Sequence, residues 1–301
     1  MDSGSIFGGY YGFVKGGIWQ ITAELGRINA GLGVETHLSS KVVAIDTAKN
    51  TAIFEKAGRE ETLDFDYLVM GTDPLTATRL LGNAEQISNT EGQRFRGSSG
   101  KLNLMFRSPV RWKFGSDASD SDAAFRFVFS VSNVDEYEEA TLKVLDDNVD
   151  YAPGFMQIYC EGAAMRHLKH AEPFDRLAVF FKNLSLGELG ADLSDVETQV
   201  RETLFEYIEN PQDCIWTRLL TPRDLQQLFH FPGGNLDHTM LTGGQTFFDR
   251  TYADDPATNF YRFGGIGNVY LCGSGTYPCG SVAGTPGYMC AQQLLRGIKV
   301  D

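Results

Sequence analysis

The residues best suited to hold a ligand lie in one glycine-rich segment, GSGTYPCGSVAGTPG at 273–287. It follows a short apolar stretch, NVYLC at 268–272, and precedes a helical pattern from about Pro286 to Leu295. A strand, a glycine-rich turn and a helix aim backbone N–H groups and a positive helix end at an anionic or electron-rich ligand. Such turns also occur for close packing alone. The residues by themselves therefore leave two readings open, a cofactor cradle and a structural turn.

Two side chains in or near this region could take part in chemistry, and each has a plainer alternative. Cys279 lies inside the glycine segment, where a helix N-terminus favours a thiolate, but a small residue also suits a tight loop. His238, in GGNLDHTML at 233–241, could line a substrate cavity as an acid/base or hydrogen-bond donor, or could stabilise its own turn. Asp249 and Arg250 are expected to be a solvated pair that orders a loop.

No metal site is expected from the histidines or the cysteines. His167 and His170 are expected in a polar loop and have no carboxylate or cysteine at ligand spacing. The cysteines are odd in number and lack the CxxC pairing of a zinc site or the density of a disulfide framework. They favour a reducing, intracellular and most simply cytoplasmic setting, with Cys272 and Cys290 in the core. The five are Cys160, Cys214, Cys272, Cys279 and Cys290.

Composition narrows the class of protein further. The 301 residues are 42% hydrophobic and carry a net charge of −13, which predicts a soluble globular chain and makes nucleic acid an unlikely partner. The apolar stretches are shorter than the roughly 20 residues that span a bilayer, and residues 1–11 lack a signal-peptide pattern. Glycine is the anomaly, with 33 residues concentrated near both ends but no GxGxxG and no GxxxxGK.

The first part of the chain has a helix and strands that must position the glycines. Ile18, Ile21, Leu25, Ile28 and Leu32 follow a 3-4-3-4 spacing, which predicts a helix over about 17–31. Strands are predicted over 34–46, 51–56 and 63–70, the last ending in a run, 67–70, that looks buried on both faces. Gly71 and Pro74 then allow a bend and open a helix over 75–81.

The middle of the chain predicts a second sheet. After a polar linker at 82–100, strands are expected at 102–106, 125–131, 156–160 and 177–181, with an acidic loop at 115–122. Helices are predicted over 134–145, 195–209 and, after a cap at Thr221, through Leu228. The second has the apolar stripe Val196, Val200, Leu204 and Ile208.

Four segments in order give the chain a family likeness. They are Gly16-Gly17 with the following GVETHLSSKVVAI (33–45), DYLVMGTDP (66–74), LLTPRDLQQLFHFPGGNLDHTML (219–241) and VYLCGSGTYPCGSVAGTPGYMCA (269–291). In these segments the chain resembles the FAD-dependent phytoene-desaturase-related and amine-oxidase-like oxidoreductases, in particular the type with pyridine nucleotide-disulphide oxidoreductase domain 2. The family's GTHPGGGV motif is altered here by Tyr277, Cys279 and Ser281.

The resemblance implies an α/β fold with FAD as cofactor. A partial, glutathione-reductase-like FAD/NAD(P)-binding domain would comprise 1–74 and 231–301. An inserted α+β substrate domain with a mixed sheet would comprise 75–230.

The resemblance also implies cofactor-binding positions. Gly16 and Gly17 would approach the flavin side, Val42 would meet the adenine through its backbone, and Gly71 would sit where a strand end passes the cofactor. Gly273, Ser274 and Gly275 would lie against the pyrophosphate and ribitol. Gly280, Val282 and Gly287 would turn backbone N–H groups toward the isoalloxazine N1–O2 edge, where negative charge develops on reduction.

One part of the family pattern is missing from these residues. The family begins with a strand, GxGxxG and a helix that bind the ADP half of FAD. The chain is therefore expected to be a C-terminal portion, or one half of a split protein whose partner chain supplies that unit, and to bind FAD weakly or not at all alone.

The implied activity is oxidation of a small apolar or amine-like organic substrate by hydride transfer to the flavin. The flavin carries this chemistry, so the catalytic residue is left unnamed. A second hypothesis remains open, because the fold also serves non-catalytic carriers of prenylated GTPases. The chain could be a lipid- or isoprenoid-binding module similar to a GDP-dissociation inhibitor.

Overall fold

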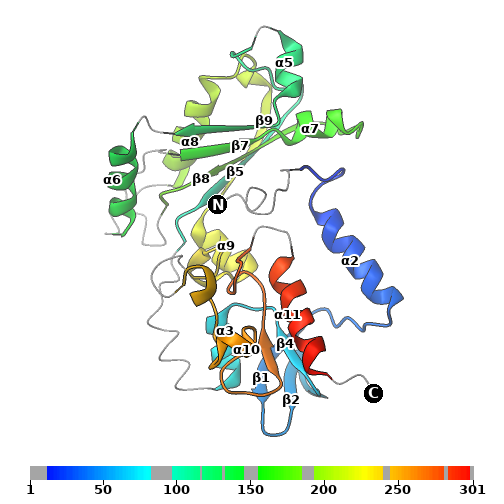
Figure 1. Cartoon of the computed structure of the whole chain (residues 1–301). Helices are drawn as coiled ribbons and strands as arrows, with labels where there is room; N and C mark the ends of the chain where they lie inside the picture. The colour runs from blue at the N-terminus through cyan, green and yellow to red at the C-terminus, as the bar shows by residue number, and fades with distance from the viewer. Residues whose placement is uncertain are drawn as a thin grey trace. The chain divides into compact units, whose positions relative to one another are not determined.

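The structure is a computed structural model that describes residues 12–82, 97–115, 117–130, 133–145, 155–184, 193–239, 245–280 and 284–298 (Figure 1). The chain divides into two compact units. Unit 1 comprises Met1–Ser3, Thr36–Arg96 and His230–Asp301, and unit 2 comprises Gly4–Glu35 and Gly97–Phe229. The domain limits at 74 and 230 stay a prediction.

Unit 2 is built on one five-stranded sheet in the order β6-β7-β8-β5-β9. Every pairing within it is antiparallel, so the expected mixed sheet is wrong. Periodicity predicts that a segment is a strand, but it does not encode the direction of the neighbouring strand. The strands are β5 (Gly100–Phe106), β6 (Arg126–Ser130), β7 (Phe155–Tyr159), β8 (Asp175–Phe181) and the unpredicted β9 (Cys214–Leu220).

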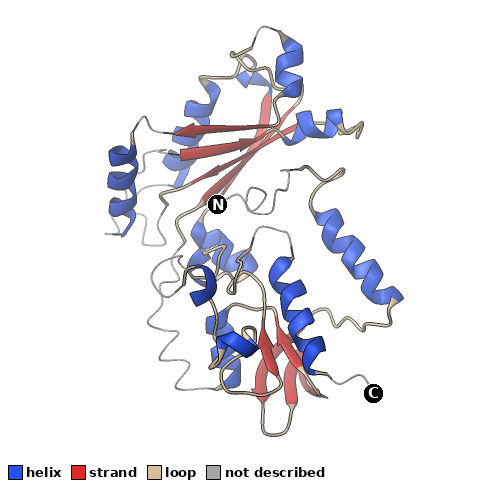
Figure 2. Ribbon diagram, in the orientation of Figure 1, coloured by secondary structure: helices blue, strands red, loops and turns tan. Residues whose placement is uncertain are grey.

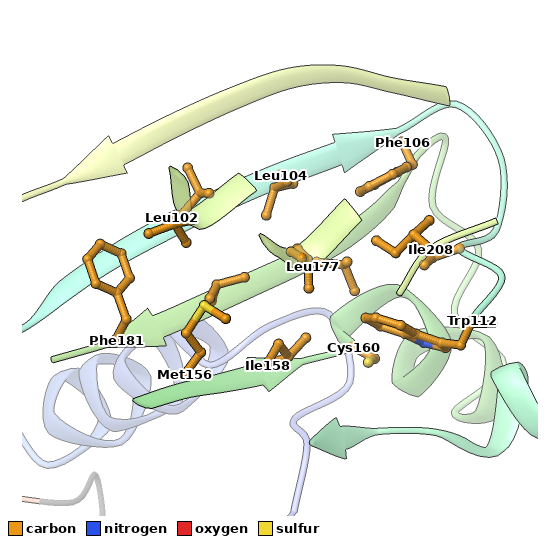
Figure 3. Packing of buried hydrophobic residues seen from close by; sticks show 14 of the residues in the cluster. Leu102, Leu104, Phe106, Trp112, Met156, Ile158, Cys160, Leu177, Phe181 and Ile208 are labelled. Atoms are coloured by element: carbon orange, nitrogen blue, oxygen red, sulfur yellow. The ribbon is translucent and has the colours of Figure 1, made fainter. Parts of the chain in front are cut away.

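The core of unit 2 is formed by buried residues of this sheet and of α8 (Leu193–Phe205). Figure 3 shows part of this cluster beside the strands. Alternate residues of β5 point inward. Val196, Val200 and Leu204 of the predicted stripe lie on α8 and are at most 1% exposed. Ile208 is also buried but lies beyond the end of α8, so the helix predicted over 195–209 extends too far. Phe125, Phe127 and Phe129 pack against the same cluster. The central buried side chains include Leu102, Leu104, Phe106, Met156, Ile158, Leu177, Phe181 and Ile208.

Short helices complete unit 2, and two of them replace expected loops. The acidic segment contains α5 (Ala118–Ala123), because the Asp117 carboxylate accepts the N–H groups of Ser119 and Asp120 and caps the helix. His167 ends α7 (Glu161–His167) instead of lying in a polar loop. The other helices are α2 (Trp19–Gly31), α6 (Val134–Leu145), η1 (Pro211–Asp213) and α9 (Pro222–Phe229).

Unit 1 contains an antiparallel sheet, β1-β2-β3, and a separate parallel pair of strands. The sheet consists of β1 (Ser40–Asp46), β2 (Thr51–Lys56) and β3 (Arg59–Asp64). The single strand predicted over 63–70 is wrong, because β3 ends at Asp64 and β4 (Leu68–Met70) begins a different sheet. Burial on both faces is also wrong for 67–70, since Tyr67 and Val69 are each 44% exposed.

The parallel pair joins two distant stretches of the chain. β4 pairs in register with the buried strand β10 (Val269–Leu271), so Met70 lies beside Leu271. Figure 2 shows the strands of the chain in red. Val269, Leu271, Phe263 and Ala77 form the core around the pair. The remaining elements are α3 (Pro74–Leu81), η2 (Pro232–Gly234), η3 (Phe247–Asp249), α10 (Pro256–Asn259) and α11 (Thr285–Gly297).

Within the described ranges, we find no helix whose length and apolar character would let it cross a membrane.

Candidate functional site

The candidate site lies at the carboxyl ends of β4 and β10. The N–H of Cys272 donates to the Met70 carbonyl at 2.9 Å and extends the pairing beyond Leu271. Gly273 follows with φ +104°, and a Cβ there would stand 3.5 Å from the Gly71 carbonyl oxygen. The two predicted glycines are therefore neighbours. Open α/β folds bind ligands at this edge, outside the carboxyl ends of parallel strands.

Gly275 permits close contact between the turn and the start of α3. The Asp73 carboxylate accepts the Thr76 N–H at 2.9 Å and caps α3, whose first residue is Pro74. A Cβ on Gly275 would stand 2.7 Å from Cδ of Pro74. Only a glycine lets these two segments approach so closely without displacement.

The loop after the turn folds back on Ser274. A Cβ on Gly280 would stand 3.0 Å from the Ser274 hydroxyl oxygen. The Cys279 thiol donates to Oδ1 of Asp237 at 3.0 Å. Burial, with Asp237 beside it, raises the pKa of Cys279 to about 11. The thiol is therefore protonated at neutral pH, which favours the reading of Cys279 as a small loop residue over that of a reactive thiolate.

Arg250 lies directly beneath the turn and is only 1% exposed, so the expected solvated pair is wrong for this residue. Its Nη2 donates to the Ser274 carbonyl at 2.7 Å and to the Asp237 carbonyl, and its Nη1 donates to the Thr239 hydroxyl at 2.6 Å. The ion pairs found between described residues do not include Arg250. A buried guanidinium held by neutral acceptors leaves positive charge under the turn, which favours an anionic ligand above it.

His238 lies in the turn after η2 and is buried at 8% exposure. Its backbone has φ +68°, and its N–H donates to the Asn235 carbonyl at 3.0 Å. Burial, helped by Arg250, lowers its pKa, against the opposite influence of Asp73 and Asp237. The imidazole is therefore neutral at pH 7.

The N-terminus of α11 presents bare backbone. Its N-cap residue is Gly284 at φ +66°, and no side chain caps the helix there. Gly287, in the first turn, has nothing within 4 Å of the position of a Cβ. Val282 lies outside the described residues. The described end of α11 can thus accept a ligand with partial or full negative charge.

The remaining predicted positions lie elsewhere. Val42 is on β1, 40% exposed, next to an irregularity in the pairing with β2. Gly16 and Gly17 belong to unit 2, where both have positive φ and the Gly16 N–H donates to Sδ of Met165 at 3.3 Å. The structure therefore brings together Gly71, Gly273, Ser274, Gly275 and Gly280, and it does not place Gly16 and Gly17 relative to them.

Sequence reasoning missed two features of this site. Arg250 carries no sequence signal beyond being a charge among aromatic residues. The second feature is a thiol pair, because half-buried Cys272 and buried Cys290 pack in one small cluster with Tyr261. A hydrogen bond from Cys290 lowers the pKa of Cys272 to about 7, while the pKa of Cys290 is raised. No cluster of three or more metal-ligating side chains occurs among the positions that the structure describes.

The thiol pair makes Cys272 the cysteine expected to react first. Only thiolates are alkylated rapidly, so its rate with iodoacetamide should rise through pH 7, being low below that pH and maximal above it. Cys290→Ala removes the hydrogen bond and should slow Cys272 alkylation at pH 7 by at least about tenfold. Mass spectrometry of tryptic peptides measures each cysteine separately. An unchanged pH midpoint in Cys290→Ala would contradict this account.

Comparison with solved structures gives a likeness in fold. The structure resembles a solved oxidoreductase from Methanosarcina mazei with a TM-score of 0.50, at 10% identity, over 94% of this chain and 55% of the other. This likeness concerns the fold alone, and it supports the expected α/β architecture.

Two curated relatives share a shorter stretch of sequence. Pyridine nucleotide-disulfide oxidoreductase domain-containing protein 2 of Mus musculus and of Rattus norvegicus are each 38% identical to this chain over 81 residues. That stretch is 27% of this chain and 13% of each relative. No protein-family model matches the sequence.

Proposed function

We propose that this chain forms the flavin-side and substrate-binding portion of an FAD-dependent oxidoreductase, related to phytoene dehydrogenases, that oxidises an apolar or amine-like organic substrate. One observation carries the proposal. At the ends of two parallel strands, bare glycine backbone surrounds a turn that rests on buried Arg250. A buried charge without an ion-pair partner among the described residues and open backbone together suit a cofactor that is both anionic and flat.

The residues at this edge fit the phosphate and flavin parts of FAD. Gly273, Ser274 and Gly275 would hold the pyrophosphate and ribitol, because their backbone lies over the Arg250 guanidinium. Gly280 and Gly287 would hold the isoalloxazine edge, where the open N-terminus of α11 favours developing negative charge. Bound FAD would supply the acceptor for a hydride from the substrate.

The other cofactor contacts remain part of the proposal. Val42 would contact the adenine, and Gly16 and Gly17 would lie on the flavin side. Gly71 would lie where the strand end passes the cofactor, and Val282 would contact the isoalloxazine edge. The ADP half also needs a strand, a GxGxxG turn and a helix, which these 301 residues do not contain. We infer that another stretch of polypeptide, in the same or a partner chain, supplies this unit.

Flavin binding by the isolated chain tests the function. Titration into FAD should give saturable quenching of flavin fluorescence with a Kd of roughly 10⁻⁴ M, since only part of the cofactor is held. Riboflavin should bind less well than FAD, because it lacks the phosphates that complement Arg250. Gly275→Ala should weaken FAD binding at least about tenfold by moving the turn away from Pro74.

Gly267→Ala is the matched control, since Gly267 also belongs to unit 1, has no positive φ and has nothing within 4 Å of a Cβ. It should leave the Kd unchanged. Stoichiometric, tightly held yellow flavin on the purified chain would contradict the need for a further dinucleotide-binding unit. Binding of a geranylgeranyl probe with no measurable FAD binding would instead favour the carrier function.

A further inference from the structure

His238 has a buried nitrogen that the fold does not use. Its Nδ1 is inaccessible to solvent and has no hydrogen-bond partner among the residues that the structure describes. The nitrogen faces the glycine turn, since it lies 3.5 Å from the position of a Cβ on Gly275. The ring packs at 5.8 Å from that of Phe231. The imidazole is thus fixed by packing, with a free polar atom toward the turn.

An unpartnered buried nitrogen is costly and uncommon. The great majority of buried polar side-chain atoms are hydrogen-bonded, and one left unpaired loses the free energy of its interaction with water. An apolar ring of similar size would fill the same space without that loss. Packing alone therefore accounts for a ring at position 238, but it does not account for an imidazole.

The left-handed backbone of this residue does not explain the imidazole either. Residues of all types other than glycine are strained at φ +68°, and asparagine adopts this region more readily than most. His230, in the same unit, has a similar φ of +59° but is exposed. The two histidines share a backbone conformation and differ in burial, which makes His230 a natural reference.

The neutral state of the ring limits what it can bind. With one nitrogen protonated and the other not, a neutral imidazole offers one donor and one acceptor. Such a nitrogen suits a hydroxyl, carbonyl or amide group better than a phosphate. The positive charge of Arg250 serves the anionic part of a ligand at the same turn.

We propose that Nδ1 of His238 binds a neutral polar group of the ligand on the Gly273–Gly275 turn, namely a ribityl hydroxyl or an isoalloxazine carbonyl. The identity of this ligand rests on the function proposed above. His238 acts as a binding and positioning residue, and it has no role in proton transfer to the substrate. Removing Nδ1 weakens ligand binding while relieving the free protein of an unsatisfied atom.

Opposite effects on stability and binding distinguish this role from a structural one. His238→Phe should raise the thermal unfolding midpoint of the ligand-free chain by about 2–4 °C relative to His230→Phe, which carries the same backbone strain at an exposed position. In fluorescence titrations, His238→Phe should weaken both FAD and riboflavin at least about tenfold. His238→Asn, whose amide reaches the place of Nδ1, should retain affinity within about threefold, and His238→Gln should not.

Each outcome has a separate meaning. A midpoint for His238→Phe several degrees below that of His230→Phe would overturn the inference, because Nδ1 would then have a partner within the protein. Unchanged flavin affinity in His238→Phe would overturn it as well. If the wild-type chain binds neither FAD nor riboflavin, the proposed function fails. A stabilised His238→Phe would in that case show only that Nδ1 is unsatisfied in the free chain, and the proposed contact with the flavin would be overturned.

Discussion

Arg250→Met is expected to destabilise unit 1 by at least about 3 kcal/mol. The substitution leaves the buried hydroxyl of Thr239 and the part-buried carbonyls of Ser274 and Asp237 without their donor. Thr239 in turn donates to Gln245, so the loss extends along a buried network. Urea unfolding followed by far-UV circular dichroism measures the change in the free energy of unfolding.

The controls separate burial from charge. Arg59→Met makes the same substitution at an exposed residue of β3 in the same unit, and it should change stability by less than about 0.5 kcal/mol. Arg250→Lys keeps the charge, but an ammonium cannot match the planar array of donors, so an intermediate loss is expected. An Arg250→Met chain as stable as Arg59→Met would contradict the buried network.

Gly162→Ala is expected to destabilise unit 2 by at least about 3 kcal/mol. A Cβ at this buried position would stand 1.4 Å from Oδ1 of Asp175 and 2.8 Å from the backbone nitrogen of Arg176. Asp175 would have to move, although its carboxylate accepts the Val110 N–H and the Arg166 guanidinium, each at 2.7 Å. Packing and two hydrogen bonds are therefore lost together.

Tryptophan fluorescence during urea unfolding reports on this unit. All three tryptophans of the chain, Trp19, Trp112 and Trp216, belong to unit 2, and Trp112 is buried in its core. Gly26→Ala is the matched control, because Gly26 lies in exposed helix α2 with nothing within 4 Å of a Cβ. Gly26→Ala should raise the free energy of unfolding of unit 2 by about 0.5–1 kcal/mol. Equal effects of the two substitutions would refute the steric explanation.

Local patterns predicted much of the secondary structure. The helix at 134–145, the strand at 51–56 and the stripe on α8 follow from the periodicity of neighbouring residues. The prediction over 63–70 failed where the chain changes sheets. There the apolar run is continuous, while the Phe65 N–H donates back to the Asn50 carbonyl and ends the hairpin before β4 begins.

The sequence also predicted only part of the candidate site. Its glycines were identified from the sequence, because a glycine-rich turn between a strand and a helix has a recognisable pattern. Arg250 was expected in solvent, since a charged side chain is usually exposed and its acceptors lie elsewhere in the sequence. Its burial depends on carbonyls at 237 and 274, which meet only after the chain has folded.

The sequence by itself determined where this chain has bare backbone, many of its helices and strands, and which family it resembles. These properties depend on residues close together along the chain. Only the tertiary structure decided that β4 and β10 pair in parallel across some 200 residues and that Arg250 lies beneath the turn. It also decided that Nδ1 of His238 has no partner among the described residues. Contacts between distant segments decide burial and hydrogen bonding, and local periodicity carries no record of them.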